Sequence, residues 1–220
     1  MMNELTVAQR VAVWILPVIF AITVHEAAHG WVAKKYGDNT ADAQGRLTVN
    51  PIKHIDWLGT VILPGLLLLT GTGFIFGWAK PVPVDARNFK KPIHDMAIVA
   101  IAGPISNVIM AIIWALIARL GMSIGASAEF ISLPLIYSGV AGISINLVLA
   151  LINLLPIPPL DGSRVLTAFL PHRLAWKYNQ LERYGFIILL VLLYTKILNT
   201  LLAYPLFFAQ NLFLSIAGMN

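Results

Sequence analysis

Long apolar runs that contain very few charged residues are the feature that most restricts the fold of this chain. Of the 220 residues, 58% are hydrophobic and only 11% are charged, whereas soluble domains carry about 25% charged residues. Four runs are long enough to cross about 30 Å of hydrocarbon as helices. They are residues 8–33, 97–119, 133–155 and 184–203. The sequence therefore predicts an all-α polytopic membrane protein with four to six transmembrane helices.

Residues 57–84 are apolar but do not have the pattern of a straight helix. A Thr-Gly-Thr-Gly sequence interrupts the run at 70–73, and Pro81 and Pro83 follow it. Such residues favour turns and re-entrant loops. We therefore predict a re-entrant, partly extended hairpin near residues 57–84. The apolar stretch 205–217 is compatible with either a short further span or an interfacial helix.

The distribution of basic residues predicts the orientation in the membrane. Lysines and arginines occur on both sides of the hairpin, in residues 34–56 and 79–96, and again in residues 156–183. Residues 120–132 contain no lysine or arginine. Because cytoplasmic loops carry an excess of basic residues, these segments alternate correctly only if 57–84 enters the membrane and returns. The N-terminus is then expected outside.

Composition excludes several other classes of protein. The chain has no cysteine, which rules out disulfides, thiolate catalysis and zinc sites built from cysteine. The net charge of +5 comes from short segments beside apolar runs, and no basic stripe with interleaved aromatic residues suggests nucleic-acid binding. We expect one membrane domain over residues 1–220, without a soluble accessory domain.

The sequence His-Glu-Ala-Ala-His at positions 25–29 lies inside the first apolar run. On a helix, positions i and i+4 share one face, so His25 and His29 can bind one metal ion. Glu26 is placed to accept a proton from a water molecule at that metal. Ionisable residues are costly within a membrane and are usually functional there. The motif therefore predicts a metal site with a nearby general base.

A catalytic zinc site needs a third protein ligand and one open position. The third apolar run ends at a proline-rich stretch followed by Asp161-Gly162, at a depth similar to that of the two histidines in the predicted topology. Asp161 is thus a candidate ligand, although an aspartate before glycine is also typical of a turn or a helix start. Further imidazoles lie in charged loops, where solvated histidines are expected: His54, His94 and His172.

Taken together, these motifs resemble the site-2 protease family of intramembrane zinc metalloproteases. The resemblance rests on residues 25–29 and 153–162, on Gly-Pro-Ile-Ser-Asn at 103–107, and on residues 77–84. It covers roughly residues 20 to 170 and is to the compact members, which lack PDZ and CBS domains. Ser163 follows Asp161-Gly162 where a second glycine is common in the family.

The resemblance implies specific roles for several residues. It implies that His25, His29 and Asp161 bind one Zn²⁺ per chain and that Glu26 is the catalytic base. It also suggests that Asn153 contacts the substrate backbone or an oxyanion, and that Asn107 lies near the active site. An amide in a membrane helix can equally serve to hold two helices together.

The resulting hypothesis is a zinc-dependent intramembrane endopeptidase that cleaves within or next to transmembrane segments of membrane proteins. Its partners would be a transmembrane protein or peptide and the lipid bilayer. Its location would be a prokaryotic plasma membrane, with the active site toward the cytoplasm. Two alternatives remain open at this stage, a small metal transporter and a catalytically inactive membrane scaffold. The sequence does not indicate the substrate or the oligomeric state.

Overall fold

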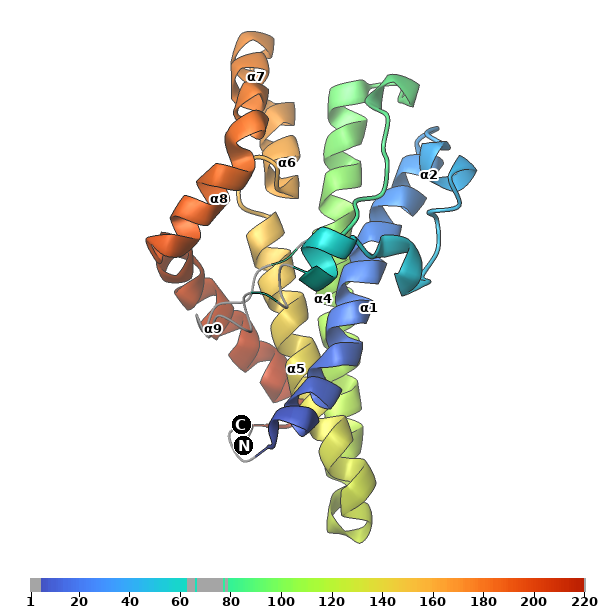
Figure 1. Ribbon diagram of the computed structural model, residues 1–220, viewed down its shortest axis with the longest axis vertical. Helices are drawn as coiled ribbons and strands as arrows, with labels where there is room; N and C mark the ends of the chain where they lie inside the picture. Colours follow the sequence, from blue (N-terminus) through green and yellow to red (C-terminus); the bar gives the residue numbers. More distant parts are fainter. Residues whose placement is uncertain (1–4, 63–65, 67–76, 78, 220) are drawn as a thin grey trace.

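The computed structural model describes residues 5–62, 66, 77 and 79–219 of the chain (Figure 1). Within this part the regular elements are all helical, as predicted for an all-α protein. The α-helices are α1 (Val7–Lys35), α2 (Thr40–Ala43), α4 (Pro92–Ile124), α5 (Glu129–Asn153), α6 (Asp161–Phe169), α7 (His172–Asn179), α8 (Gly185–Tyr194) and α9 (Ile197–Ala217). Short 3₁₀ or π segments are η2 (Pro51–His54), η3 (Trp57–Ile62), η4 (Ala86–Asn88), η5 (Gly125–Ala128) and η6 (Gln180–Tyr184).

Helices α1, α4 and α5 lie side by side and form the centre of the molecule (Figure 1). Among the described residues, three helical stretches are long and apolar enough to cross a membrane: Ala8–Lys35, Pro92–Asn153 and Ile197–Ala217. The second stretch includes both α4 and α5, which pack against each other. With 33 residues, α4 is about 50 Å long and exceeds the roughly 30 Å of hydrocarbon. The long apolar helices agree with the predicted membrane location.

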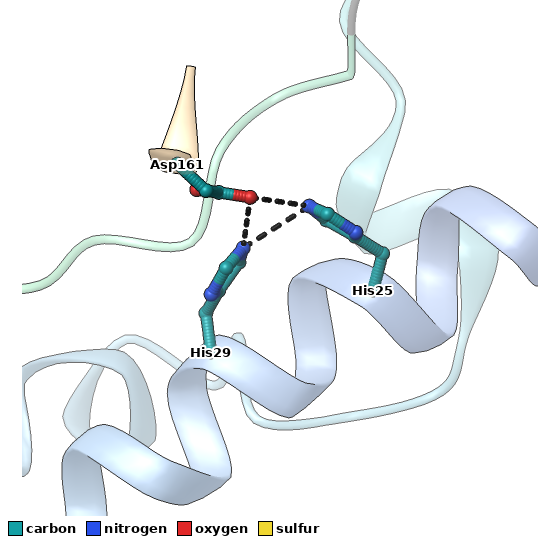
Figure 2. A group of neighbouring side chains, drawn as sticks. All are labelled: His25, His29 and Asp161. Atoms are coloured by element: carbon teal, nitrogen blue, oxygen red, sulfur yellow. Dashed lines mark hydrogen bonds and ion pairs between the residues drawn. The ribbon is translucent and has the colours of Figure 1, made fainter. Parts of the chain in front are cut away.

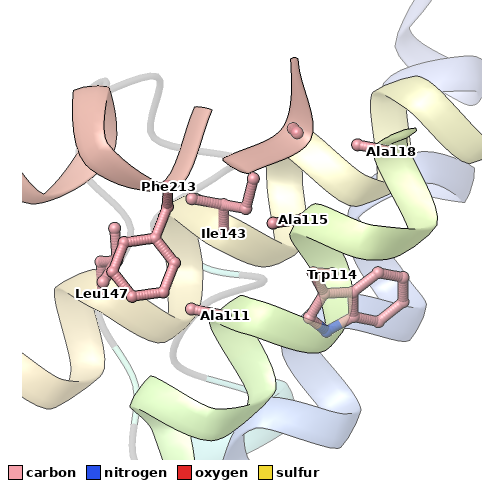
Figure 3. Close-up of a cluster of buried hydrophobic side chains, with 8 residues drawn as sticks. Ala111, Trp114, Ala115, Ala118, Ile143, Leu147 and Phe213 are labelled. Carbon is pink, nitrogen blue, oxygen red and sulfur yellow. The ribbon is translucent and has the colours of Figure 1, made fainter. Parts of the chain in front are cut away.

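Small residues allow α4 and α5 to approach closely. A methyl group added at Gly142 would overlap the indole ring of Trp114, and one at Gly139 would lie 2.5 Å from the Cβ atom of Ala118. Such contacts between small residues are typical of helix packing in membranes. Helix α9 completes this core by adding Phe213 to the buried cluster (Figure 3).

The C-terminal part of the chain differs from the sequence prediction. The predicted single span 184–203 is two helices, because α8 ends at Tyr194 and α9 begins at Ile197. Lys196 adopts a left-handed conformation with φ of 59° at the junction, and a left-handed residue cannot continue an α-helix. Residues 205–217 are not a separate helix either, since they form the second half of α9. The two helices meet at an angle, and α9 returns to α4 and α5 (Figure 1).

Half of the predicted hairpin at 57–84, namely residues 63–65, 67–76 and 78, lies outside the described residues. Its first described part is the π-helical segment η3. The re-entrant hairpin therefore stays a prediction.

The segment that follows the hairpin is attached to the end of α1 by Asp38. The buried carboxylate of Asp38 accepts hydrogen bonds from the Asp85 N–H at 2.8 Å and from Asn88 Nδ2 at 2.7 Å. Burial acts to raise the pKa of Asp38, but hydrogen bonds from Thr40 and Asn88 outweigh it and the pKa is lowered. Asp38 is thus held as an anion that fixes residues 85–88 beside α1.

Candidate metal centre

Three side chains from two distant parts of the chain, α1 and α6, converge on one point (Figure 2). His25 and His29 project from one face of α1, and Asp161 is the first residue of α6. The Nε2 atoms of the two histidines are 3.1 Å apart, and Asp161 Oδ2 lies 3.2 Å from His25 Nε2 and 3.4 Å from His29 Nε2. The structure thus brings together the three residues proposed as ligands.

The spacing and chemistry of these three candidate ligand atoms fit a zinc ion. Ligands in tetrahedral positions at 2.0–2.1 Å from one ion are separated by about 3.3 Å, and the three atoms are 3.1 to 3.4 Å apart. Asp161 Oδ2 is buried and has no hydrogen-bond partner among the described residues, as expected of an oxygen that is available to a cation. Two imidazoles and one carboxylate also leave the open fourth position of a catalytic site.

The backbone of α4 forms one wall of the site at Gly103. A methyl group at this position would lie 2.5 Å from both His25 Cε1 and His29 Nε2. Because carbon and nitrogen atoms do not approach this closely without displacement, only glycine leaves room for both imidazoles in their observed positions. The role of Gly103 is therefore steric.

Asp161 is positioned by the close approach of α6 to the end of α5. A side chain at Gly162 would collide with the carbonyl oxygen of Leu154. The helix can therefore begin directly against the end of α5, and Asp161 in its first turn reaches the histidines. The Asp-Gly pair thus has a specific steric purpose here, whereas the sequence alone was also compatible with an ordinary turn.

A chain of buried amides fixes the tautomer of His25. Asn146 Nδ2 donates to the Gly142 carbonyl at 2.8 Å, and its Oδ1 accepts from Asn107 Nδ2 at 2.9 Å. Asn107 Nδ2 also donates to the Ala21 carbonyl at 3.1 Å. Since carbonyl oxygens only accept, Asn107 Oδ1 must accept from His25 Nδ1, at 2.6 Å. The proton of His25 is therefore on Nδ1, and the Nε2 lone pair faces the other two candidate ligand atoms of the metal site.

A backbone carbonyl fixes His29 in the same way. His29 Nδ1 lies 2.8 Å from the carbonyl oxygen of Val99, which can only accept, so Nδ1 carries the proton and Nε2 has a free lone pair. Both imidazoles are thus held in the tautomer that binds a metal through Nε2.

Glu26 lies between the two histidines in sequence and is half-buried. Its Oε2 accepts a hydrogen bond from the backbone N–H of Val82 at 2.8 Å. The carboxylate is therefore oriented by the last part of the predicted hairpin, through a contact between residues 56 positions apart.

The remaining predicted residues have various environments. Asn107 contacts His25. Asn153 donates from Nδ2 to the Leu149 carbonyl of its own helix at 3.0 Å, so its contact with a substrate stays a prediction. The other histidines contact other groups: His54 Nε2 bonds the Thr48 carbonyl, His94 pairs with Asp95, and His172 is the exposed first residue of α7.

Sequence reasoning did not identify Asn146, which is fully buried and orients Asn107. The only sequence feature that could have indicated its role is its position as an isolated amide in an apolar run. We expect the substitution Asn146→Leu to weaken zinc binding by about 10- to 100-fold, because removing the group that supports a metal ligand typically costs that much. Competition with a chelator measures the affinity. Asn199→Leu, at an exposed position of α9, is the matched control, and equal affinities in the two variants would contradict this role of Asn146.

Comparison with known proteins places this geometry in a family. The family model described as Peptidase family M50 matches residues 13–132 and 122–194. The chain belongs to peptidase family M50. This is the site-2 protease family, so the resemblance seen in the motifs is confirmed.

Three curated relatives share the name "Putative zinc metalloprotease". YwhC of Bacillus subtilis (strain 168) is 45% identical over 83% of this chain and 80% of its own length. Rip2 of Mycolicibacterium smegmatis is 32% identical over 82% of this chain and 66% of its own length. MJ0611 of Methanocaldococcus jannaschii is 34% identical over 64% of this chain and 62% of its own length. No solved structure matches the chain.

Membership in family M50 confirms the predicted metalloprotease activity and the zinc cofactor. Members of the family are integral membrane proteins, in agreement with the apolar helices of this chain.

Proposed function

We propose that this M50 protein is a zinc-dependent intramembrane endopeptidase, which hydrolyses peptide bonds within or next to transmembrane segments of membrane proteins. The observation that carries the proposal is the position of a three-donor site between helices long and apolar enough to span a membrane. A soluble substrate would have no access to such a site, whereas a transmembrane segment can reach it by lateral diffusion.

In this proposal His25, His29 and Asp161 hold the zinc ion. Zinc supplies a Lewis acid that polarises the scissile carbonyl and lowers the pKa of a water molecule toward about 7. The protein residues contribute the positions of the groups. Asn107 and the Val99 carbonyl keep the histidines in the required tautomer, and Asp161 adds a negative charge.

Glu26 is the proposed general base and acid. It follows His25 directly on α1, so its carboxylate can accept a proton from the attacking water and later give that proton to the leaving amine. The Val82 N–H holds one of its oxygens at 2.8 Å. Asn153 is the proposed contact to the substrate backbone or to the oxyanion that develops on the carbonyl.

The substrate must unwind before it can be cleaved, because the carbonyl groups of a helix are bonded internally. We expect the predicted hairpin at 57–84 to bind the unwound segment in extended form by strand addition. For the cellular location, basic residues Lys34 and Lys35 follow the histidines at the end of α1. The positive-inside rule then orients the active site toward the cytoplasm, in a prokaryotic plasma membrane.

The substitution Glu26→Gln tests this function. We expect the variant to retain zinc and to lose at least about 100-fold in the cleavage rate, because general acid–base catalysis contributes 10²–10⁴-fold. Zinc content and cleavage of a transmembrane peptide in detergent or liposomes are measured for both proteins. Zinc in both with cleavage in neither would support an inactive scaffold, zinc flux into liposomes would support a transporter, and absence of zinc from the folded protein would contradict the metal centre.

A further inference from the structure

The main chain at Lys80–Val82 passes directly beside the proposed base. The Val82 N–H donates to Glu26 Oε2 at 2.8 Å, and the Val82 side chain is only 7% exposed. Val82 also packs against α1 one turn beyond Glu26, since a methyl group at Gly30 would lie 3.1 Å from Val82 Cγ1. The direction in which the Glu26 carboxylate points therefore depends on where this segment lies.

The segment has no regular structure of its own to hold it in place. Pro81 and Pro83 have no backbone N–H group, so Lys80 and Val82 carry the only backbone hydrogen-bond donors in residues 80–83. The Lys80 N–H donates to the His54 carbonyl at 2.9 Å. With the Val82 N–H bonded to Glu26, the position of the intervening carbonyl groups must be fixed from elsewhere.

Arg46 supplies that contact. Its Nη2 donates to the Lys80 carbonyl at 2.8 Å and is 3.3 Å from the Pro81 carbonyl. The residue is 7% exposed, and its backbone N–H is bonded to the Ala41 carbonyl at 2.9 Å. None of the ion pairs among the described residues involves Arg46. A buried cation is costly unless it is compensated, so its contacts with these two carbonyls are energetically important.

One peptide group connects the arginine to the glutamate. The Pro81 carbonyl, which faces Arg46, and the Val82 N–H, which binds Glu26, belong to the same planar unit. A positive charge near the carbonyl oxygen increases the polarity of that unit and strengthens the bond donated by its N–H. Any displacement of the carbonyl is also transmitted to the N–H, because the unit is rigid.

We propose that Arg46 is a positioning residue for peptide hydrolysis, which fixes the Pro81–Val82 peptide group and through it the carboxylate of Glu26. The inference rests on the proposed function, since it gives Arg46 a role only if Glu26 transfers the proton. Arg46 touches neither the three donors of the metal centre nor, in this arrangement, the reacting atoms. Its loss therefore affects the rate of the chemical step and leaves zinc binding intact.

The test compares Arg46→Gln and Arg46→Lys with the unaltered protein. We expect Arg46→Gln to retain one zinc per chain, while kcat for cleavage of a transmembrane peptide falls by about 10- to 100-fold, as for misplaced catalytic groups. Arg46→Lys keeps the charge but can reach one carbonyl only, so an intermediate kcat is expected. Arg87→Gln, at an arginine of η4 with an 89% exposed side chain, is the matched control.

Hydrogen–deuterium exchange gives a readout that does not depend on activity. Exchange resolved to single residues is followed at the Lys80 and Val82 amides, because the prolines carry none. In Arg46→Gln both amides are expected to exchange faster. In Glu26→Ala, which removes only the acceptor of Val82, faster exchange is expected at Val82 alone.

A double variant separates positioning from general destabilisation. Val82→Pro removes the N–H that binds Glu26, so adding Arg46→Gln to it should cause no further loss of kcat. Additive losses, loss of zinc in Arg46→Gln, or an unchanged kcat would each overturn the proposal. If the unaltered protein holds zinc but cleaves no peptide, the proposed function fails, and unchanged exchange at Val82 in Arg46→Gln would overturn the positioning role independently.

Discussion

Replacing Asp161 by alanine is expected to abolish stable zinc binding and peptide cleavage together. Without Asp161, the remaining candidate ligands His25 and His29 lie on one helix and leave two of the four positions around the metal open. In the unaltered protein Asp161 Oδ2 faces both histidines and has no hydrogen-bond partner among the described residues. Even removing a hydrogen-bond partner of a ligand costs about 10- to 100-fold in affinity, so losing a ligand should cost more. Metal analysis after dialysis against a chelator, together with a cleavage assay, measures both effects.

Asp42→Ala is the appropriate control for this experiment. Asp42 forms a 2.7 Å ion pair with Lys34 at the surface, where both side chains are nearly half exposed. An exposed pair contributes about 0–1 kcal/mol, so this variant should retain zinc and activity. If Asp161→Ala also retained one zinc per chain, the third ligand would have to be another residue.

The addition of one methyl group at Gly103 is expected to have nearly as large an effect. In Gly103→Ala the new carbon would lie 2.5 Å from atoms of both imidazoles. Neither ring can move freely, because Asn107 and the Val99 carbonyl hold their Nδ1 atoms. One or both Nε2 atoms must then leave the arrangement that fits a metal, and we expect a loss of zinc affinity and of cleavage, each by more than about 100-fold.

Val108→Ile provides the control for Gly103→Ala. It adds one carbon to the same helix at a partly exposed position, away from the metal centre. Thermal unfolding in detergent distinguishes a local effect from a general one, since a local effect leaves the melting temperature of Gly103→Ala close to that of the control. Full zinc occupancy in Gly103→Ala would contradict the steric role of this glycine.

Structural features that are set by residues close together in the sequence could be predicted from the sequence alone. The placement of His25 and His29 on one face follows from the helical repeat alone, and α1, α4 and α5 follow from the lengths of their apolar runs. The family resemblance rested on short motifs and was confirmed. Asp161 was recognisable as a ligand candidate because its motif is local, although only the packing of α6 shows that it reaches the histidines.

Hydropathy failed where a short break interrupts a continuous apolar run. Residues 184–203 remain apolar across Thr195 and Lys196, so the averaged pattern predicts one helix, whereas the left-handed backbone at Lys196 divides it. Arg46 shows that a count of charged residues likewise does not reveal the environment of a single residue. In the sequence it counts as one basic residue of a cytoplasmic loop, but in the structure it is buried against two carbonyl groups.

The chemical identity of the site follows from local sequence, because a metal-binding helix face and an acidic residue before a glycine are set by residues a few positions apart. The residues that hold these groups in position cannot be identified from local sequence. Gly103, Asn146 and Arg46 act, directly or through one further residue, on His25, His29 and Glu26, from which they are separated by 20 to 121 positions of the chain. Such contacts exist only once α1, α4, α5 and the segment Lys80–Val82 have packed, because their distances depend on the tertiary fold and not on any periodicity of the sequence.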